Sequence, residues 1–179
     1  MLLRGVLSAS LIVIGLGSAS LLAQEQQDGE LEQYTIEQFL KTTNYRGASF
    51  SPDKQKLLVS SDETGVYNAF AIPLGGGDPV QLTDSTTDTI SVISYFPDDE
   101  RFLYTADQGG NELNHIYVRN TDGSSQDLTP GKNLKAGFAG WSQDNKSFFV
   151  TSNERTPQFF DLYEYNVDSL ERDLIFQND

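Results

Sequence analysis

The residues that could do chemistry in this 179-residue chain are few. The one histidine, His115, stands beside Ile116 in an apolar, strand-like run, and the chain contains neither cysteine nor a G-x-S-x-G nucleophile motif. A Ser–His–Asp triad would have to recruit His115 from inside a strand, so we interpret His115 as a packed strand residue. The sequence predicts no catalytic residue and identifies no substrate-binding residue.

Acidic and amide side chains recur at one position, as Asp62-Glu63, Asp107 and Asn153-Glu154. Because the position recurs, we interpret these residues as loop-forming and capping groups; a site for a cation or a substrate amine is the alternative. A lone histidine without cysteine predicts no metal site. Gly75–Gly77 and Gly109–Gly110 precede no helix, so they are interpreted as turn glycines and not as a phosphate cradle. No cofactor is expected.

These polar residues belong to a repeat of about 45 residues, the length of a propeller blade. Each copy opens on an aromatic residue, continues through two apolar strands and ends on a short strand that contains a leucine. The openings are Phe50-Ser51-Pro52-Asp53, Tyr95-Phe96-Pro97-Asp98 and Trp141-Ser142-Gln143-Asp144; the third strands begin at Asn68, Asn114 and Phe160; the closing leucines are Leu82, Leu128 and Leu174. We interpret the recurring Phe50, Tyr95 and Trp141 as packing residues.

The repeat predicts an all-β fold, an incomplete β-propeller of three four-stranded antiparallel blades at about 44–83, 89–129 and 135–176. Three blades do not close a ring, and closure is what protects strand edges and blade faces. We therefore expect that the natural protein continues beyond Asp179; assembly of several copies is the alternative.

The N-terminal residues have the pattern of an export signal. Arg4 is followed by an apolar stretch that ends at Ala23, which predicts a signal peptide over 1–23. The alternative is an uncleaved membrane anchor, because about 20 apolar residues span a bilayer. Residues 24–33 are acidic and rich in Gln, which predicts a flexible linker, and Thr35–Lys41 predict a short helix that covers part of the first blade.

The composition disfavours some classes of binding partner and membrane anchor. The formal net charge of −14 disfavours nucleic acid. The absence of cysteine excludes a lipoprotein anchor and a disulfide framework. The predicted location is periplasmic or secreted, with membrane contact only if the signal stays uncleaved.

The segment Phe50–Thr83 resembles the blade repeat shared by TolB-like propellers and the prolyl oligopeptidase family of serine peptidases. Tyr34–Leu40, Tyr45–Asp53, Asp107–Glu112 and Asn153–Arg155 are similar to exported bacterial peptidases of that family. The resemblance spans residues 34–179. It implies a propeller that screens peptide substrates by size and packs against a C-terminal α/β-hydrolase domain, which would carry the Ser, Asp and His.

Two functions follow from the resemblance. The first is the N-terminal propeller fragment of an exported dipeptidyl or acylaminoacyl peptidase, inactive without the hydrolase domain. The dipeptidyl branch grips the substrate's amino terminus with paired glutamates, and this sequence has no adjacent Glu-Glu pair, so no site residue carries over. The alternative is part of a TolB-like periplasmic propeller that binds proteins and has no enzymatic activity.

Overall fold

A computed structural model describes residues 33–179, so the predicted signal peptide and residues 24–32 of the predicted linker lie outside the described residues. The chain divides into two compact units, Met1–Phe39 and Leu40–Asp179. The blades belong to the second unit.

Helix α1 spans Ile36–Leu40, within the predicted range. It begins with a capping box: the Gln38 N–H donates to Thr35 Oγ1 at 3.1 Å, and the Thr35 N–H donates to Gln38 Oε1 at 2.9 Å. These two bonds satisfy backbone donors that a short helix would otherwise leave unpaired. The helix is confirmed, and its task of covering the first blade stays a prediction.

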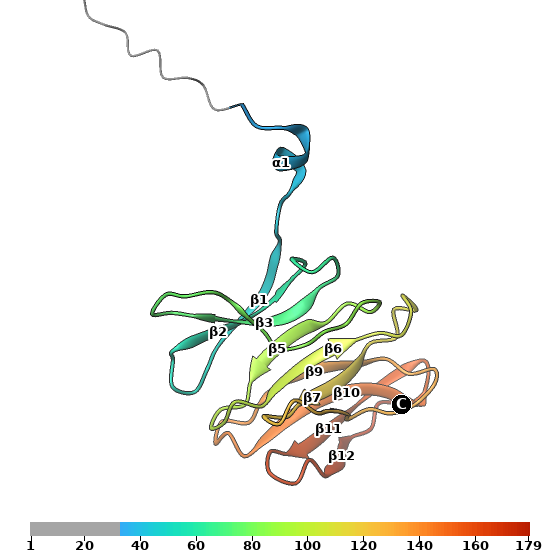
Figure 1. Ribbon diagram of the computed structural model, residues 1–179. Coiled ribbons are helices and arrows are strands. Elements are labelled where there is room, and N and C mark those ends of the chain that lie inside the picture. The colour runs from blue at the N-terminus through green and yellow to red at the C-terminus, as the bar shows by residue number, and fades with distance from the viewer. Residues whose placement is uncertain (1–32) are drawn as a thin grey trace, which may run out of the picture. The chain divides into compact units, whose positions relative to one another are not determined.

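Twelve strands form three four-stranded antiparallel sheets, each in sequential order (Figure 1). Blade 1 contains β1 (Tyr45–Phe50), β2 (Lys56–Ser61), β3 (Asn68–Pro73) and β4 (Val80–Gln81); blade 2 contains β5 (Ser91–Tyr95), β6 (Phe102–Ala106), β7 (His115–Arg119) and β8 (Ser125–Asp127); blade 3 contains β9 (Ala136–Trp141), β10 (Ser147–Thr156), β11 (Phe159–Asn166) and β12 (Arg172–Phe176). The predicted all-β fold of three blades is confirmed.

The hydrophobic core consists of two layers, one on each side of blade 2. Between blades 1 and 2, Leu58 packs with Val92 and Tyr104. Between blades 2 and 3 the core joins Leu103, Ile116 and Val118 of blade 2 to Phe148, Val150 and Tyr165 of blade 3. Blade 2 therefore has both faces covered by neighbours (Figure 1).

Serine hydroxyls connect neighbouring blades along their first strands. Ser49 Oγ on β1 accepts a hydrogen bond from the Tyr95 N–H at 3.0 Å, and Ser94 Oγ on β5 accepts one from Trp141 Nε1 at 3.0 Å. Each serine lies next to a break in strand register, at Arg46/Ser49 in β1 and at Val92/Ser94 in β5. A bulge of this kind twists the strand and redirects its side chains, here toward the next blade.

The aromatic residues that open the repeat do not all pack as predicted. Tyr95 is 5% exposed, and Trp141 packs edge-on against Phe96 and Phe148 at centroid distances of 5.2 and 5.4 Å. Phe50, in contrast, is 61% exposed. The prediction is wrong for Phe50 because Tyr95 and Trp141 pack toward the preceding blade, and no blade precedes blade 1 among the described residues.

The closing strands are also shorter than predicted at two of the three leucines. Leu174 lies inside β12, whereas Leu82 and Leu128 follow the ends of β4 and β8. Their N–H groups still extend the ladder, donating to the carbonyls of Ala69 and Ile116 at 2.8 Å. After these leucines, the hydroxyls of Thr83 and Thr129 accept the hydrogen bonds of the Ala69 and Ile116 N–H groups in place of a backbone carbonyl. The backbone ladder therefore ends there.

Gly47 of blade 1 lies close to Val92 of blade 2. Its φ is +63°, and a Cβ there would lie 3.0 Å from Val92 Cγ2 and 3.2 Å from the Val92 carbonyl oxygen. We expect Gly47→Ala to lower the free energy of unfolding by about 1–3 kcal/mol, because it adds a clash to the strain of a positive φ. Thermal unfolding followed by Trp141 fluorescence measures the change.

The matched control is Gly109→Ala, since Gly109 has a φ of +65° and open space around its Cβ position. The Gly109→Ala variant therefore has the strain of a positive φ without a clash against a neighbouring blade. An equal loss of stability in both variants would show that the blade contact at Gly47 contributes nothing.

Candidate functional site

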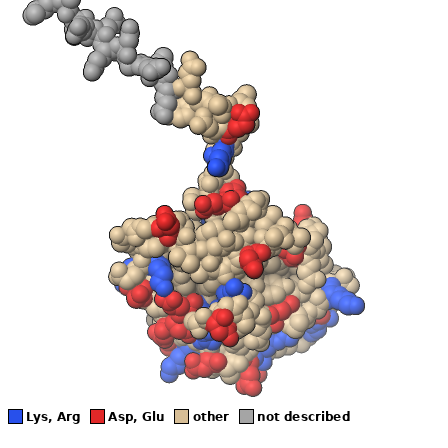
Figure 2. Space-filling view, viewed as in Figure 1, with Lys and Arg blue, Asp and Glu red and all other residues tan. Residues whose placement is uncertain are grey.

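Charged side chains of both signs share the surface of the blades. On the face shown in Figure 2, lysine and arginine side chains lie among aspartates and glutamates. Among the described residues no group of three or more His, Asp or Glu side chains could hold a metal ion. No helix in the described part of the chain is long and apolar enough to cross a membrane.

His115 is a buried structural residue, as predicted. It is 3% exposed, and its Nδ1 lies 2.8 Å from Asp127 Oδ2 on the neighbouring strand β8. The other oxygen of Asp127 accepts a hydrogen bond from the Thr129 N–H at 2.9 Å. The pair therefore fixes the segment that leaves blade 2, and it is not available to activate a nucleophile at the surface.

The strand register shows that His115 has counterparts in the other blades. His115 pairs with Ala106, as Asn68 pairs with Ser61 and Asp161 pairs with Ser152. The spacing of the sequence repeat instead aligns Asn68 with Asn114 and Phe160. That alignment is off by one residue because it allows for only one of the two additional residues that separate the second and third strands in blades 2 and 3.

In blade 1, Asn68 holds the segment that leaves the blade. Its Oδ1 accepts a hydrogen bond from the Ser85 N–H at 2.8 Å, and its Nδ2 donates to the Ser85 carbonyl at 2.9 Å. Thr83 Oγ1 also donates to Asn68 Oδ1 at 2.9 Å and accepts a bond from the Ala69 N–H at 2.8 Å. One buried amide thus binds both backbone groups of the exit segment.

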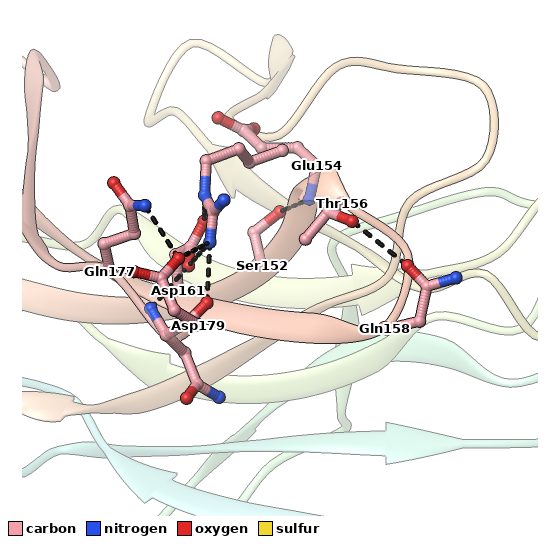
Figure 3. Close-up of polar contacts among 9 residues, drawn as sticks. Ser152, Glu154, Thr156, Gln158, Asp161, Gln177 and Asp179 are labelled. Atoms are coloured by element: carbon pink, nitrogen blue, oxygen red, sulfur yellow. Dashed lines mark hydrogen bonds and ion pairs between the residues drawn. The ribbon is translucent and has the colours of Figure 1, made fainter.

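In blade 3 an ion pair makes the same two contacts. Asp161 is 0% exposed; its Oδ2 accepts a bond from Arg155 Nε at 2.8 Å, and its Oδ1 accepts one from the Asn178 N–H at 2.9 Å. Arg155 Nη2 donates to the Asn178 carbonyl at 2.6 Å. Figure 3 shows Asp161 next to Asp179 in this network. The hydrogen bonds from Arg155 and Asn178 hold the pKa of Asp161 below its usual value.

Three of the five recurring acidic and amide residues, Asp62, Asp107 and Asn153, act as caps, as predicted. Asp62 Oδ1 accepts a hydrogen bond from the Asn44 N–H at 2.7 Å, and Asn153 Oδ1 accepts one from the Lys135 N–H at 2.6 Å. Each bond fixes the chain just before the first strand of its blade. Asp107 Oδ2 instead accepts a bond from the Glu112 N–H at 3.0 Å inside its own loop.

Glu154 is not the loop residue that the sequence predicted. Asn153 and Glu154 lie inside β10, which runs to Thr156 and turns back through a two-residue hairpin. The Glu154 carboxylate accepts a hydrogen bond from Arg172 Nη1 at 2.8 Å. Burial, followed by the hydrogen bond and charge of Glu154, raises the pKa of Tyr163 to about 12. Glu154 is thus engaged within blade 3, whereas Glu63 is exposed at the surface.

Comparison with known proteins identifies relatives of these blades. No protein-family model matches the chain. The dipeptidyl aminopeptidase BIII of Pseudoxanthomonas mexicana is 35% identical over 136 residues, which cover 72% of this chain and 19% of that protein. The chain is similar to one part of this peptidase. The match spans about a fifth of the peptidase's length.

Solved structures show the same fold. A prolyl endopeptidase superimposes with a TM-score of 0.59 and 16% identity over 75% of this chain and 22% of its own. TolB from Acinetobacter baumannii superimposes with a TM-score of 0.55 and 21% identity over 74% of this chain and 32% of its own. The predicted resemblance to the N-terminal propeller portion of prolyl oligopeptidase-type peptidases, with TolB-like blades, is confirmed.

The Arg155–Asp161 pair predicts a pH-dependent part of the stability. Because the pKa of Asp161 is lowered in the folded chain, its contribution is present above the ordinary aspartate pKa of about 4 and is lost as the pH falls through the folded value. We expect Asp161→Asn to lower the thermal midpoint by several degrees at pH 7, and the gap to the wild type to narrow toward pH 3.

Asp78→Asn, in the exposed connection between β3 and β4, removes the same charge without touching the Arg155–Asp161 pair and serves as the control. Circular dichroism at pH 7, 5 and 3 measures all three proteins. A gap between wild type and Asp161→Asn that stays constant over this range would show that the ion pair is not what stabilises the exit segment.

Proposed function

We propose that this chain forms the first three blades of the propeller of an exported serine peptidase of the prolyl oligopeptidase family, of the dipeptidyl type. The observation that carries the proposal is the 35% identity to a dipeptidyl aminopeptidase over 136 residues, on a chain that folds into three successive blades. The predicted signal peptide over 1–23 supports export to the periplasm or the medium.

In this proposal the blades control access and the chemistry occurs elsewhere. A propeller of packed blades is a rigid wall with a central channel, which limits the size of the peptides that reach an enclosed site. The buried His115–Asp127 pair serves the blade itself, so the nucleophile, its base and the oxyanion hole would come from a C-terminal α/β-hydrolase domain. The partners are peptide substrates and the remaining blades.

The first test is an activity assay. The purified 179-residue chain and the full-length product of its gene are incubated with dipeptidyl and acyl-amino-acid p-nitroanilides. We expect turnover of a dipeptidyl anilide by the longer product and none by the 179-residue chain. Turnover by the 179-residue chain alone would contradict the proposal that the catalytic residues lie in a separate C-terminal domain.

The second test reads the gene downstream of the Asp179 codon. The proposal predicts an in-frame continuation that encodes more blades and then a G-x-S-x-G motif. A continuation that ends after the last blade would support the TolB-like alternative, a protein-binding propeller without a hydrolase domain. The match to TolB at 21% identity shows the fold alone and does not favour that alternative.

A further inference from the structure

A groove of about 410 Å³ lies between the outer parts of blades 1 and 2. Its walls are Val80 and Leu82 at β4, Phe102 on β6, Arg119 at the end of β7 and the turn that follows Arg119. This volume is within the range of sites that bind small molecules or short peptide segments.

At the corresponding place between blades 2 and 3, a hollow of about 570 Å³ is lined by a buried tyrosine in place of an arginine. Tyr165 pairs with Phe148 as Arg119 pairs with Phe102, so the two residues occupy one position of the repeat. Tyr165 is 1% exposed, stacks on Phe148 at 5.0 Å and donates its hydroxyl to the Leu128 carbonyl of blade 2 at 2.8 Å. The two hollows therefore differ in chemistry: Arg119 brings a guanidinium to the groove between blades 1 and 2, whereas the Tyr165 hydroxyl is bonded to the neighbouring blade.

The groove lining contains two cations, Lys56 and Arg119, and only Lys56 is in an ion pair with a described residue. Lys56 of blade 1 and Glu100 of blade 2 form an ion pair at the groove and offset each other. Within residues 33–179, Arg119 donates a hydrogen bond to Ser125 Oγ at 3.3 Å and forms no ion pair. The lining therefore carries one guanidinium that is outside any ion pair of the described chain. Asp122, in the turn that follows Arg119, is close enough that the Arg119 charge, after the hydrogen bonds from Ser124, lowers its pKa. A single carboxylate is the matching charge, and arginine binds carboxylates with two parallel hydrogen bonds.

The strand that borders the groove favours a peptide over other carboxylates. β4 is the outermost strand of blade 1, so one of its backbone edges has no partner strand in the described part of the chain. An extended peptide can offer main-chain hydrogen bonds to such an edge, which a fatty acid cannot. Val80 is 55% exposed and, with Phe102 below, provides apolar surface for a side chain.

We propose that this groove binds the carboxy-terminal residues of an extended peptide, with an apolar side chain against Val80 and Phe102 and the terminal carboxylate on Arg119. This inference stands whether or not the complete protein is a peptidase.

The test compares two probes on the unmodified chain. A fluorescein-labelled alanine peptide ending in Leu-Phe is prepared with a free carboxylate and as the amide, and binding is followed by fluorescence anisotropy. We expect the free acid to bind at least about tenfold more tightly, the scale of a charge-assisted hydrogen bond. Equal affinity for the two probes would overturn the proposal, and this comparison does not depend on whether any variant folds.

Variants locate the effect. Arg119→Gln should reduce the affinity for the acid to that for the amide, because it removes the guanidinium and keeps a polar side chain. Lys132→Gln, which loses the same charge in the exposed segment between blades 2 and 3, should change neither affinity. An acid preference that survives Arg119→Gln, or displacement of the peptide by an equal concentration of octanoate, would refute the assignment.

Discussion

The structure depends on one constraint: the apolar faces of each four-stranded blade must be covered by a neighbouring blade. Blade 2 carries Leu103 and Ile116 on one face and Tyr104 on the other, and all three are buried only because blades 1 and 3 lie against them. A strand that is apolar on both sides gains little by folding alone, since burial of apolar surface drives folding. Each blade therefore stabilises its neighbours, and residues such as Phe50 and Phe176 stay exposed where no neighbour lies.

Stacked blades also need their connections fixed, and the chain meets this need with three chemistries at one register position. Asn68 uses an amide, His115 uses an aspartate partner and Asp161 uses an arginine partner. All three are buried and hydrogen-bonded, as the cost of burying a polar group requires. What looks in the sequence like candidate catalytic or ligand-binding chemistry is thus used to direct the chain from blade to blade. The proposed binding groove lies elsewhere, beside Arg119 between blades 1 and 2.

The blades could be predicted because their strands and turns recur at a fixed period, and the aromatic and β-branched residues between polar turns identify each strand. The role of Asn68, His115 and Asp161 in holding the segment that leaves each blade could not be predicted. Two extra loop residues shift His115 and Asp161 away from a fixed spacing to Asn68, and only strand pairing restores the alignment. Aligning the repeat strand by strand would have identified these residues. The groove could not be predicted either, because its walls come from two different blades and depend on how the blades pack.

The central claim is that contacts between blades, and not the sheets themselves, provide the stability. Hydrogen–deuterium exchange of the 179-residue chain tests it most directly, because amide protection reports local opening. The account predicts the slowest exchange in β6 and β7 of blade 2, which has both faces covered, and faster exchange at equivalent strands of blades 1 and 3. Equal protection of β2, β6 and β10 would contradict it, since each blade would then be stable without its neighbours.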